Sequence, residues 1–297
     1  MRRSHQLGLK RQWIQRIGCG EKLIIVNYDC AAVRLATWFG SIRNARSHFA
    51  TCLLALGRPA VRERNAVECW RDACDRAGAH KLMVVTEIFK SIQGESTFAG
   101  LPCVFVRLTG CNLRCHWCDT AYAFHGGEKM TVDQVLAEVH KLGGKLVEVT
   151  GGEPLLQPDV YPLTERLLHD SFQVLVETSG ERHVGRLPEA VVKVVDVKCP
   201  GSGEGGKFCD ENLAFLSKKD QIKFVIVDET DYLYARQFML DNDLRSRVGE
   251  VIFSPVFGQL PPLQLAQWIL RDGLEVRLGL QLHKFIWDPR RGGFDKK

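Results

Sequence analysis

Two kinds of hydrophobic pattern alternate along the chain from residue 84 onward. Short apolar, β-branched runs predict buried strands, and amphipathic stretches between them predict helices. The expected helices are 131–143, with Thr131 as candidate N-cap, and 261–273; both end at a glycine. The expected strands are 103–109, 146–150, 173–178, 191–198, 222–228 and 250–254, with 275–283 as a candidate final strand. This alternation predicts an α/β fold with a mainly parallel sheet, either open or curled into a barrel.

Polar and glycine-rich sequences follow every predicted strand. In parallel α/β folds the loops after the carboxyl ends of the strands assemble the site. Each sequence alone is an ordinary turn, but together they predict an active site at one edge of the sheet. They are TGCNLRCHWCDT (109–120), TGGEP (150–154), ETSG (177–180), DVKCPGSG (196–203), VDET (227–230) and SPVFG (254–258).

The first 82 residues lack this organisation and differ in charge. Residues 1–80 carry 14 Lys and Arg against 6 Asp and Glu, a balance of +8, whereas residues 81–297 carry 26 against 29, a balance of −3. The overall charge of +5 is therefore no evidence of nucleic-acid binding by the remainder. Three interpretations are open for this segment: a basic arm, a small extra domain, or a stretch outside the mature fold. We expect residues 1–82 to be a basic leader, disordered or outside the mature fold, and residues 83–297 to be the catalytic domain, with Met83 a candidate start.

Composition indicates a reducing compartment. No apolar run reaches the roughly 20 residues of a membrane span, and the basic N-terminus lacks the apolar core and cleavage site of an export signal. Eleven cysteines is an odd number, which without an export signal indicates reduced, metal-bound or reactive thiols. We expect a cytoplasmic protein without a membrane or direct nucleic-acid partner.

Three thiols, Cys111, Cys115 and Cys118, lie within eight positions. Such spacing predicts zinc or an iron–sulfur cluster. A structural zinc site normally takes four protein ligands, and His116, between two of the cysteines, is too close in sequence to join them around one ion without strain. A [4Fe–4S] cluster takes one ligand per iron, so three cysteines leave one iron open.

The Cys-x3-Cys-x2-Cys spacing, with Trp117 before the last cysteine, resembles the cluster loop of the radical S-adenosylmethionine (SAM) superfamily. Gly-Gly-Glu-Pro at 151–154 resembles the SAM-binding motif of that superfamily. The resemblance implies an incomplete (β/α)6-type barrel with mainly parallel strands, and a [4Fe–4S] cluster whose open iron chelates SAM. One electron then cleaves SAM to a 5′-deoxyadenosyl radical, while the protein orients and shields the reactants.

A longer pattern narrows the resemblance. IQGES (92–96), Gly-x-Pro-x-x-Phe-x-Arg (100–107), the cysteines with Asp-Thr (119–120), and QLHKFIW (281–287) resemble the 7-carboxy-7-deazaguanine synthase family. The resemblance runs from about residue 84 to residue 287 and does not cover the first 82 residues. The alternative family is that of the activating enzymes, which generate a glycyl radical on a partner protein. These enzymes share the cysteine loop and Gly-Gly-Glu-Pro but not this combination of motifs.

The synthase resemblance implies a reaction and its requirements. 6-Carboxy-5,6,7,8-tetrahydropterin rearranges to 7-carboxy-7-deazaguanine with loss of ammonia, on the route to 7-deazapurines such as queuosine. The family uses SAM catalytically and requires Mg²⁺. It also implies an electron donor such as flavodoxin or ferredoxin, and a homodimer.

The same resemblance assigns roles to matching positions. The oxygen of Thr120 matches the Mg²⁺ ligand, as suits a hard ion. Arg107 matches the arginine that binds the substrate carboxylate, for which a planar guanidinium is suited. The other substrate-binding positions are Ile92, Gln93, Gly94, Glu95, Thr150, Gln281 and His283. The SAM-binding positions are Gly152, Glu153, Ser179, Asp196, Val197, Lys198, Ser254, Pro255, Val256 and Phe257.

Plainer interpretations stand beside these roles. Thr120 is equally a candidate turn or N-cap hydroxyl, and a lone histidine such as His283 is commonly structural. Some family members end soon after the final strand, whereas residues 288–297 continue here, which leaves their role open. A zinc or RNA-binding module would need a fourth metal ligand and stacked aromatics among basic residues. Residues 84–297 show neither clearly, and we interpret Cys199 and Cys209 as packing or incidental residues.

Overall fold

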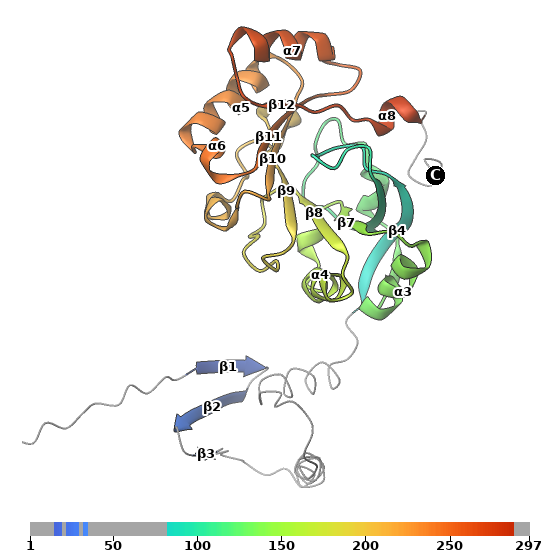
Figure 1. Cartoon of the computed structure of the whole chain (residues 1–297), viewed down its shortest axis with the longest axis vertical. Helices are drawn as coiled ribbons and strands as arrows, with labels where there is room; N and C mark the ends of the chain where they lie inside the picture. Colours follow the sequence, from blue (N-terminus) through green and yellow to red (C-terminus); the bar gives the residue numbers. More distant parts are fainter. Residues whose placement is uncertain (1–14, 20–21, 30–31, 35–81, 288–297) are drawn as a thin grey trace, which may run out of the picture. The chain divides into compact units, whose positions relative to one another are not determined.

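A mixed nine-stranded sheet forms the frame of residues 78–297 in the computed structural model (Figure 1). Its order is β12-β11-β10-β9-β8-β7-β5-β4-β6, with parallel neighbours from β5 to β12 and antiparallel pairing of β4 with β5 and β6. Because β12 and β6 leave open edges, the sheet does not close, and the predicted incomplete barrel is confirmed. The strands are β4 (Met83–Ile92), β5 (Pro102–Leu108), β6 (Glu128–Met130), β7 (Leu146–Gly151), β8 (Gln173–Thr178), β9 (Val192–Asp196), β10 (Gln221–Ile226), β11 (Glu250–Pro255) and β12 (Arg277–Leu278).

The six predicted parallel strands are all present, with ends within two residues of the prediction. The candidate final strand at 275–283 is much shorter, because β12 covers only Arg277–Leu278. The prediction omitted β4 and β6. In β4 the buried positions include Glu87, a charged residue that interrupts the apolar alternation by which strands are recognised.

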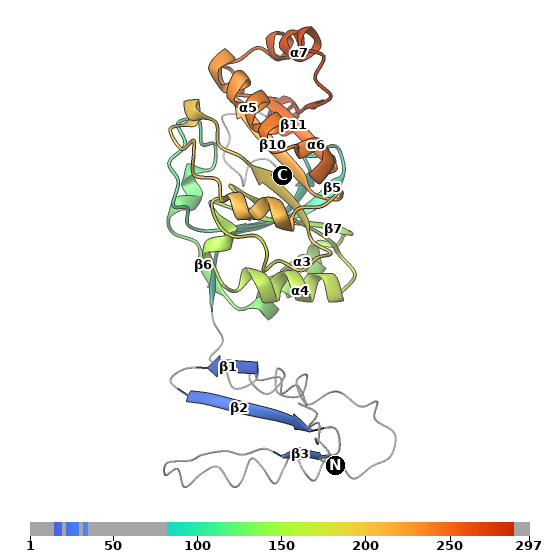
Figure 2. The same cartoon turned by 90° about the vertical axis from the view of Figure 1, so that its left-hand side faces the viewer.

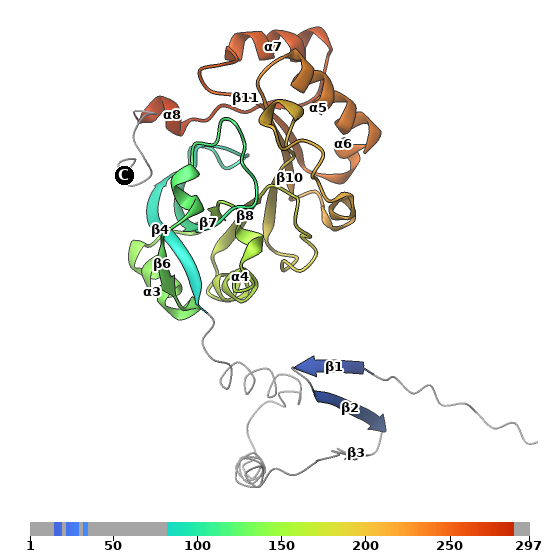
Figure 3. The same ribbon diagram turned by 180° about the vertical axis from the view of Figure 1, so that it is seen from behind.

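Helices α3 to α7 cover the outer, convex side of the curved sheet (Figures 1 and 3), and α3 and α4 lie side by side (Figure 2). Helix α8 is different, because its residues His283 and Lys284 line the cavity on the inner side. The predicted Thr131 cap is confirmed as a capping box, in which Thr131 and Gln134 each bind the other's backbone N–H. The helices are α3 (Val132–Leu142), α4 (Val160–His169), α5 (Glu229–Asp241), α6 (Leu244–Arg247), α7 (Pro262–Arg271) and α8 (His283–Ile286). Short 3₁₀ turns lie at η1 (Ala121–Phe124), η2 (Pro154–Leu156), η3 (Pro200–Ser202) and η4 (Asp210–Phe215).

The two faces of the sheet have different roles. Because side chains alternate along a strand, Val104 and Val106 of β5 pack into the core under α3 and α4, while Phe105 and Arg107 point to the inner face. A second core joins β10 and β11 to α5 and α7. The inner face therefore supplies the positions from which polar side chains reach one shared space.

A β-bulge changes the face that β4 presents. Val85 pairs with Leu108, and both belong to the core under α3, whereas Glu87 pairs with Arg107. The register shift lies between Val85 and Glu87. In a regular strand these two residues would share a face, so the bulge directs Glu87 to the inner side.

The structure describes residues 15–19, 22–29, 32–34 and 82–287. The chain divides into the units Met1–Ala77 and Gly78–Lys297. In the first unit, β1 (Gln15–Cys19), β2 (Lys22–Asp29) and β3 (Ala32–Arg34) form an antiparallel sheet. Most of the expected leader and residues 288–297 lie outside the described residues, so both expectations stay predictions.

Candidate active site

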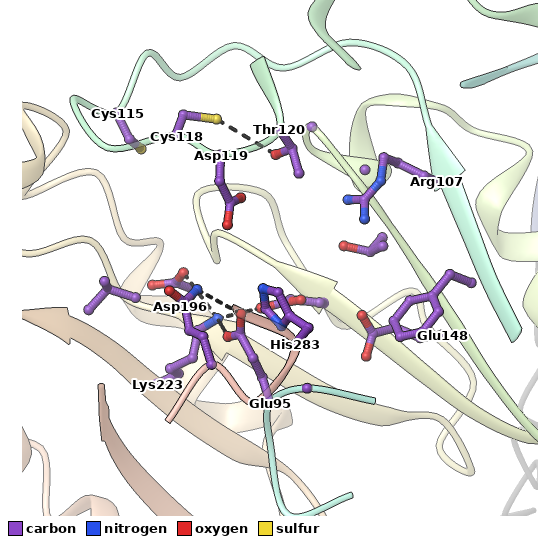
Figure 4. A pocket seen from close by; sticks show the side chains of 18 of the residues that line it. Glu95, Arg107, Cys115, Cys118, Asp119, Thr120, Glu148, Asp196, Lys223 and His283 are labelled. Atoms are coloured by element: carbon purple, nitrogen blue, oxygen red, sulfur yellow. Dashed lines mark hydrogen bonds and ion pairs between the residues drawn. The ribbon is translucent and has the colours of Figure 1, made fainter. Parts of the chain in front are cut away.

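A cavity of about 260 Å³ lies on the inner face of the sheet, between the cysteine loop and the first turn of α8 (Figure 4). Most of the predicted site residues line it. These are Ile92, Gln93, Gly94, Glu95, Arg107, Cys111, Cys115, Cys118, Thr120, Thr150, Gly152, Ser179, Asp196, Lys198, Val256, Phe257, Gln281 and His283. Four others, Glu153, Val197, Ser254 and Pro255, are buried and do not line it.

The three cysteines stand on one loop whose base is closed by a hydrogen bond of 2.8 Å from the Gly110 N–H to the Ala123 carbonyl. Their thiols are partly buried and line the cavity. Burial raises the pKa of the Cys111 and Cys115 thiols, so metal binding would release protons from them.

The thiols fit a cluster better than a single ion. No three His, Cys, Asp or Glu side chains in the described part of the chain are grouped to hold one metal ion, whereas a cluster takes one thiolate per iron. His116 is engaged elsewhere. Its ring Nδ1 lies 3.0 Å from the Gly201 carbonyl oxygen, and its backbone N–H donates to the Ser202 carbonyl oxygen. Cys199 is buried in the core under α5, as expected of a packing residue.

Gly152 and Glu153 tie the loop after β7 to its neighbours. A Cβ on Gly152 would overlap the Gly110 carbonyl and the Cys111 side chain, so this glycine permits close packing against the cysteine loop. The buried Glu153 carboxylate accepts hydrogen bonds from Thr178 Oγ1 at 2.8 Å and from Ser179 N and Oγ at 2.8 and 2.7 Å. These contacts indicate a positioning role, and its predicted contact with SAM stays a prediction.

An ionised network crosses the floor of the cavity (Figure 4). The Lys223 ammonium lies 2.5 Å from Glu177, 2.6 Å from Glu95 and 3.5 Å from Asp196. Lys198 also pairs with Asp196, at 2.8 Å from Oδ2, while the buried Oδ1 has no hydrogen-bond partner among the described residues. The network leaves Asp196 with an acceptor that a ligand donor would satisfy.

Burial and charge act in opposite directions on the pKa values of this network. Burial would raise the pKa of Glu95, but Lys223 and His283 outweigh it and hold that pKa below its ordinary value. Burial raises the pKa of Glu148 well above its ordinary value, and Glu177 and Glu95 add to the rise. Burial would lower the pKa of Lys223, but Glu177 and Glu95 outweigh burial and raise that pKa well above its ordinary value. Lys223 therefore stays charged and keeps Glu95 ionised.

The segment Ile92–Glu95 lies against residues 281–287, called the C-terminal segment below. Gln281 Nε2 donates to Glu95 Oε1 at 2.9 Å, and the Leu282 N–H donates to the Gly94 carbonyl at 2.9 Å. Gln93 Nε2 donates to Glu148 Oε2. Two of the stretches that carry the family resemblance, 92–96 and 281–287, thus form one wall, although 186 positions separate Glu95 from Gln281.

Arg107 stands at one end of the cavity (Figure 4). Its Nε donates to Glu87 Oε1 at 2.9 Å, and the Tyr122 hydroxyl donates to the same oxygen at 2.8 Å. Thr120 lies nearer the cysteines, with Oγ1 3.6 Å from Cys118 Sγ. Its hydroxyl caps no backbone N–H of η1, so the plain N-cap interpretation fails.

The sequence analysis missed several charged residues of the site. Lys223, Glu177 and Glu148 line the cavity from strands, and Asp119 lines it beside Thr120. The sequence did contain a signal for these residues, because charged side chains are rarely buried within apolar strands. Which of these side chains meet depends on which strands are neighbours in the sheet, and the sequence of a single strand does not specify its neighbours.

Comparisons with known proteins show which proteins the chain resembles. Residues 105–199 match the radical SAM superfamily. The chain is 54% identical over 225 residues to a 7-carboxy-7-deazaguanine synthase of Koribacter versatilis, covering 71% of this chain and 100% of the relative. It is 44% identical over 212 residues to that of Chlorobaculum tepidum, covering 70% and 96%. The crystal structure of QueE from Escherichia coli matches with a TM-score of 0.58 and 24% identity, over 69% of this chain and 96% of that one, a likeness of fold. No helix among the described residues is long and apolar enough to cross a membrane.

Proposed function

Because this chain belongs to the 7-carboxy-7-deazaguanine synthase family, we propose that its cavity converts 6-carboxy-5,6,7,8-tetrahydropterin to 7-carboxy-7-deazaguanine with loss of ammonia. One observation carries the proposal: Arg107, Glu95 and the three cysteines line a single cavity. The comparisons favour this lyase over an enzyme that activates a partner protein.

Cys111, Cys115 and Cys118 would hold the [4Fe–4S] cluster that the superfamily implies. With SAM bound, that cluster supplies one-electron chemistry that no side chain offers. The protein's own part is to position both ligands and exclude water. The cavity on the inner face is suited to this, because the cysteine loop and the C-terminal segment form its walls.

SAM lies, in this proposal, between the cysteine loop and the ends of β7, β8 and β9. Gly152 allows the loop after β7 to pack on the cysteine loop. Lys198 and Asp196 line the same cavity, and Asp196 Oδ1 is a buried acceptor without a partner among the described residues. Val256 and Phe257 supply an apolar wall after β11. These groups complement a ligand with both charged and aromatic parts.

The pterin lies against Ile92–Glu95 and the C-terminal segment. Glu95, kept ionised by Lys223, accepts ring N–H groups, and Gln93 offers an amide edge. Arg107 binds the carboxylate with its planar guanidinium. Thr150, Gln281 and His283 line the same space.

Mg²⁺ binds at Thr120 in this proposal. The hydroxyl lines the cavity and caps no helix. Mg²⁺ tolerates few protein ligands and completes its shell with water and substrate oxygens, so a single hydroxyl beside the substrate carboxylate suits it.

The wider setting is proposed from the family. The protein acts in the cytoplasm as a homodimer, receives its electron from a flavodoxin or ferredoxin, and feeds queuosine-type 7-deazapurine synthesis. Residues 83–297 form the catalytic domain, and residues 1–82 are a dispensable leader.

The test is one anaerobic assay on the full chain. The protein is reconstituted with iron and sulfide and given SAM, dithionite, Mg²⁺ and 6-carboxytetrahydropterin, and products are followed by mass spectrometry. We expect carboxydeazaguanine and ammonia without stoichiometric consumption of SAM. Cleavage of SAM without pterin turnover would assign the protein a different substrate.

A further inference from the structure

A buried carboxylate with no role in the proposed reaction stands behind Arg107. The side chain of Glu87 is fully buried, and Glu87 does not line the cavity, whereas Arg107 does. The two residues are cross-strand partners on β4 and β5, and the β-bulge after Val85 gives them the same face. The fold thus places a negative charge directly behind the substrate-facing guanidinium.

The contact leaves most of the guanidinium available. Glu87 Oε1 accepts from Nε at 2.9 Å, and no hydrogen bond from the two Nη groups of Arg107 is formed to the described residues. A guanidinium held at Nε presents its Nη pair as a fork, the arrangement that binds a carboxylate in bidentate fashion. Tyr122 donates to the same Oε1 at 2.8 Å and so restrains the acceptor.

Stability alone does not account for Glu87. Its second oxygen, Oε2, is buried and has no partner among the described residues. An unsatisfied buried carboxylate oxygen is costly, and apolar residues of similar volume commonly serve stability as well as a buried ion pair. An arrangement that costs stability beside a binding group indicates a role in binding.

We propose that Glu87 is a positioning residue, which holds the Arg107 guanidinium so that its two Nη groups meet the pterin carboxylate. The inference rests on the proposed function, since it takes that carboxylate as the ligand of Arg107. Glu87 touches no substrate in this arrangement and acts through Arg107. Its contribution is therefore specific to ligands that carry a carboxylate.

The test is equilibrium binding of two inert probes, 6-carboxypterin and unsubstituted pterin, to the full-length, cluster-reconstituted protein with SAM. We expect Glu87→Ala to weaken binding of 6-carboxypterin at least about tenfold, because a hydrogen bond to a charged group is lost, and to leave binding of pterin unchanged. Glu87→Gln keeps most of the affinity, because its amide oxygen still accepts from Nε. In an Arg107→Ala background, Glu87→Ala adds no further loss. Glu138→Ala, an exposed change on α3, is the matched control.

The outcomes separate the two proposals. If the unaltered protein binds both probes equally, carboxylate recognition fails, and the proposed function with it. If the unaltered protein prefers 6-carboxypterin and Glu87→Ala retains that preference, the positioning role is overturned while the proposed function stands. Equal weakening for both probes would reveal a merely structural residue. If Glu87→Ala does not fold, Glu87→Met, which fills the volume without an acceptor, gives the same comparison.

Discussion

The imidazole of His283 lies against Gly94, so closely that a Cβ at position 94 would overlap its Nδ1. The adjacent Leu282 N–H donates to the Gly94 carbonyl at 2.9 Å. A glycine is therefore required where the C-terminal segment closes over Ile92–Glu95.

We expect Gly94→Ala to displace His283 and to raise the KM for the pterin about tenfold or more, because the wall of the site no longer closes. Steady-state kinetics on the reconstituted protein measures this. The contact is tested by repeating the change in a His283→Ala background, where the added methyl has room. A penalty of the same size in both backgrounds would show that the overlap is not its cause.

Cys115→Ala is expected to abolish turnover by removing a cluster ligand. Iron and sulfide content, together with the visible absorbance of the reconstituted protein, should fall sharply. Cys209→Ser is the matched control, since Cys209 donates to Glu211 at 2.9 Å outside the cavity. Unchanged iron content in Cys115→Ala would exclude this thiol as a ligand.

Lys223→Met is expected to destabilise the fold by about 3–5 kcal/mol, because it leaves buried carboxylates without their partner. Lys223 holds the pKa of Glu95 below its ordinary value. The ionised Glu95 carboxylate therefore adds stability above the unfolded pKa of about 4.3, and this stability is lost as the pH falls through the folded pKa. That contribution is equal at pH 5 and pH 8, and it disappears in the variant. Burial raises the pKa of Glu148 and that of Glu177, so these carboxylates ionise increasingly between pH 5 and pH 8 and then repel one another without the ammonium. The loss should therefore be larger at pH 8 than at pH 5.

Denaturant unfolding at the two pH values measures this difference. Lys141→Met is the control, since Lys141 is exposed on α3, where it pairs with the exposed Glu138. A loss that does not depend on pH would contradict the electrostatic account.

Thr120→Ala should raise the Mg²⁺ concentration needed for half-maximal turnover, whereas Thr120→Ser, which retains the oxygen, should stay close to the unaltered protein. A Mg²⁺ titration of turnover at saturating pterin compares the three. The same Mg²⁺ dependence for Thr120→Ala as for the unaltered protein would remove Thr120 as the ligand.

Residues 83–297 alone are expected to bind the cluster and turn over with the kcat of the full chain, because the site lies within the unit Gly78–Lys297. Parallel assays of both proteins measure this. A loss of activity with cluster content intact would give residues 1–82 a role in the reaction.

The sequence by itself determined the local features. The six parallel strands, the Thr131 cap and the cysteine loop were predicted, because hydrophobic periodicity, capping residues and ligand spacing are short-range properties. The family resemblance also rested on contiguous motifs, which is why most of the predicted site residues line the cavity.

Only the tertiary structure decided which distant side chains meet. The contact of Lys223 with Glu95 joins residues 128 positions apart, and that of Gln281 with Glu95 spans 186. The pairing of Glu87 with Arg107 depends on a one-residue bulge that reverses which face of β4 points inward. Side-chain alternation fixes only two opposite faces, so the local pattern leaves open which face meets the cavity, and strand pairing supplies the answer.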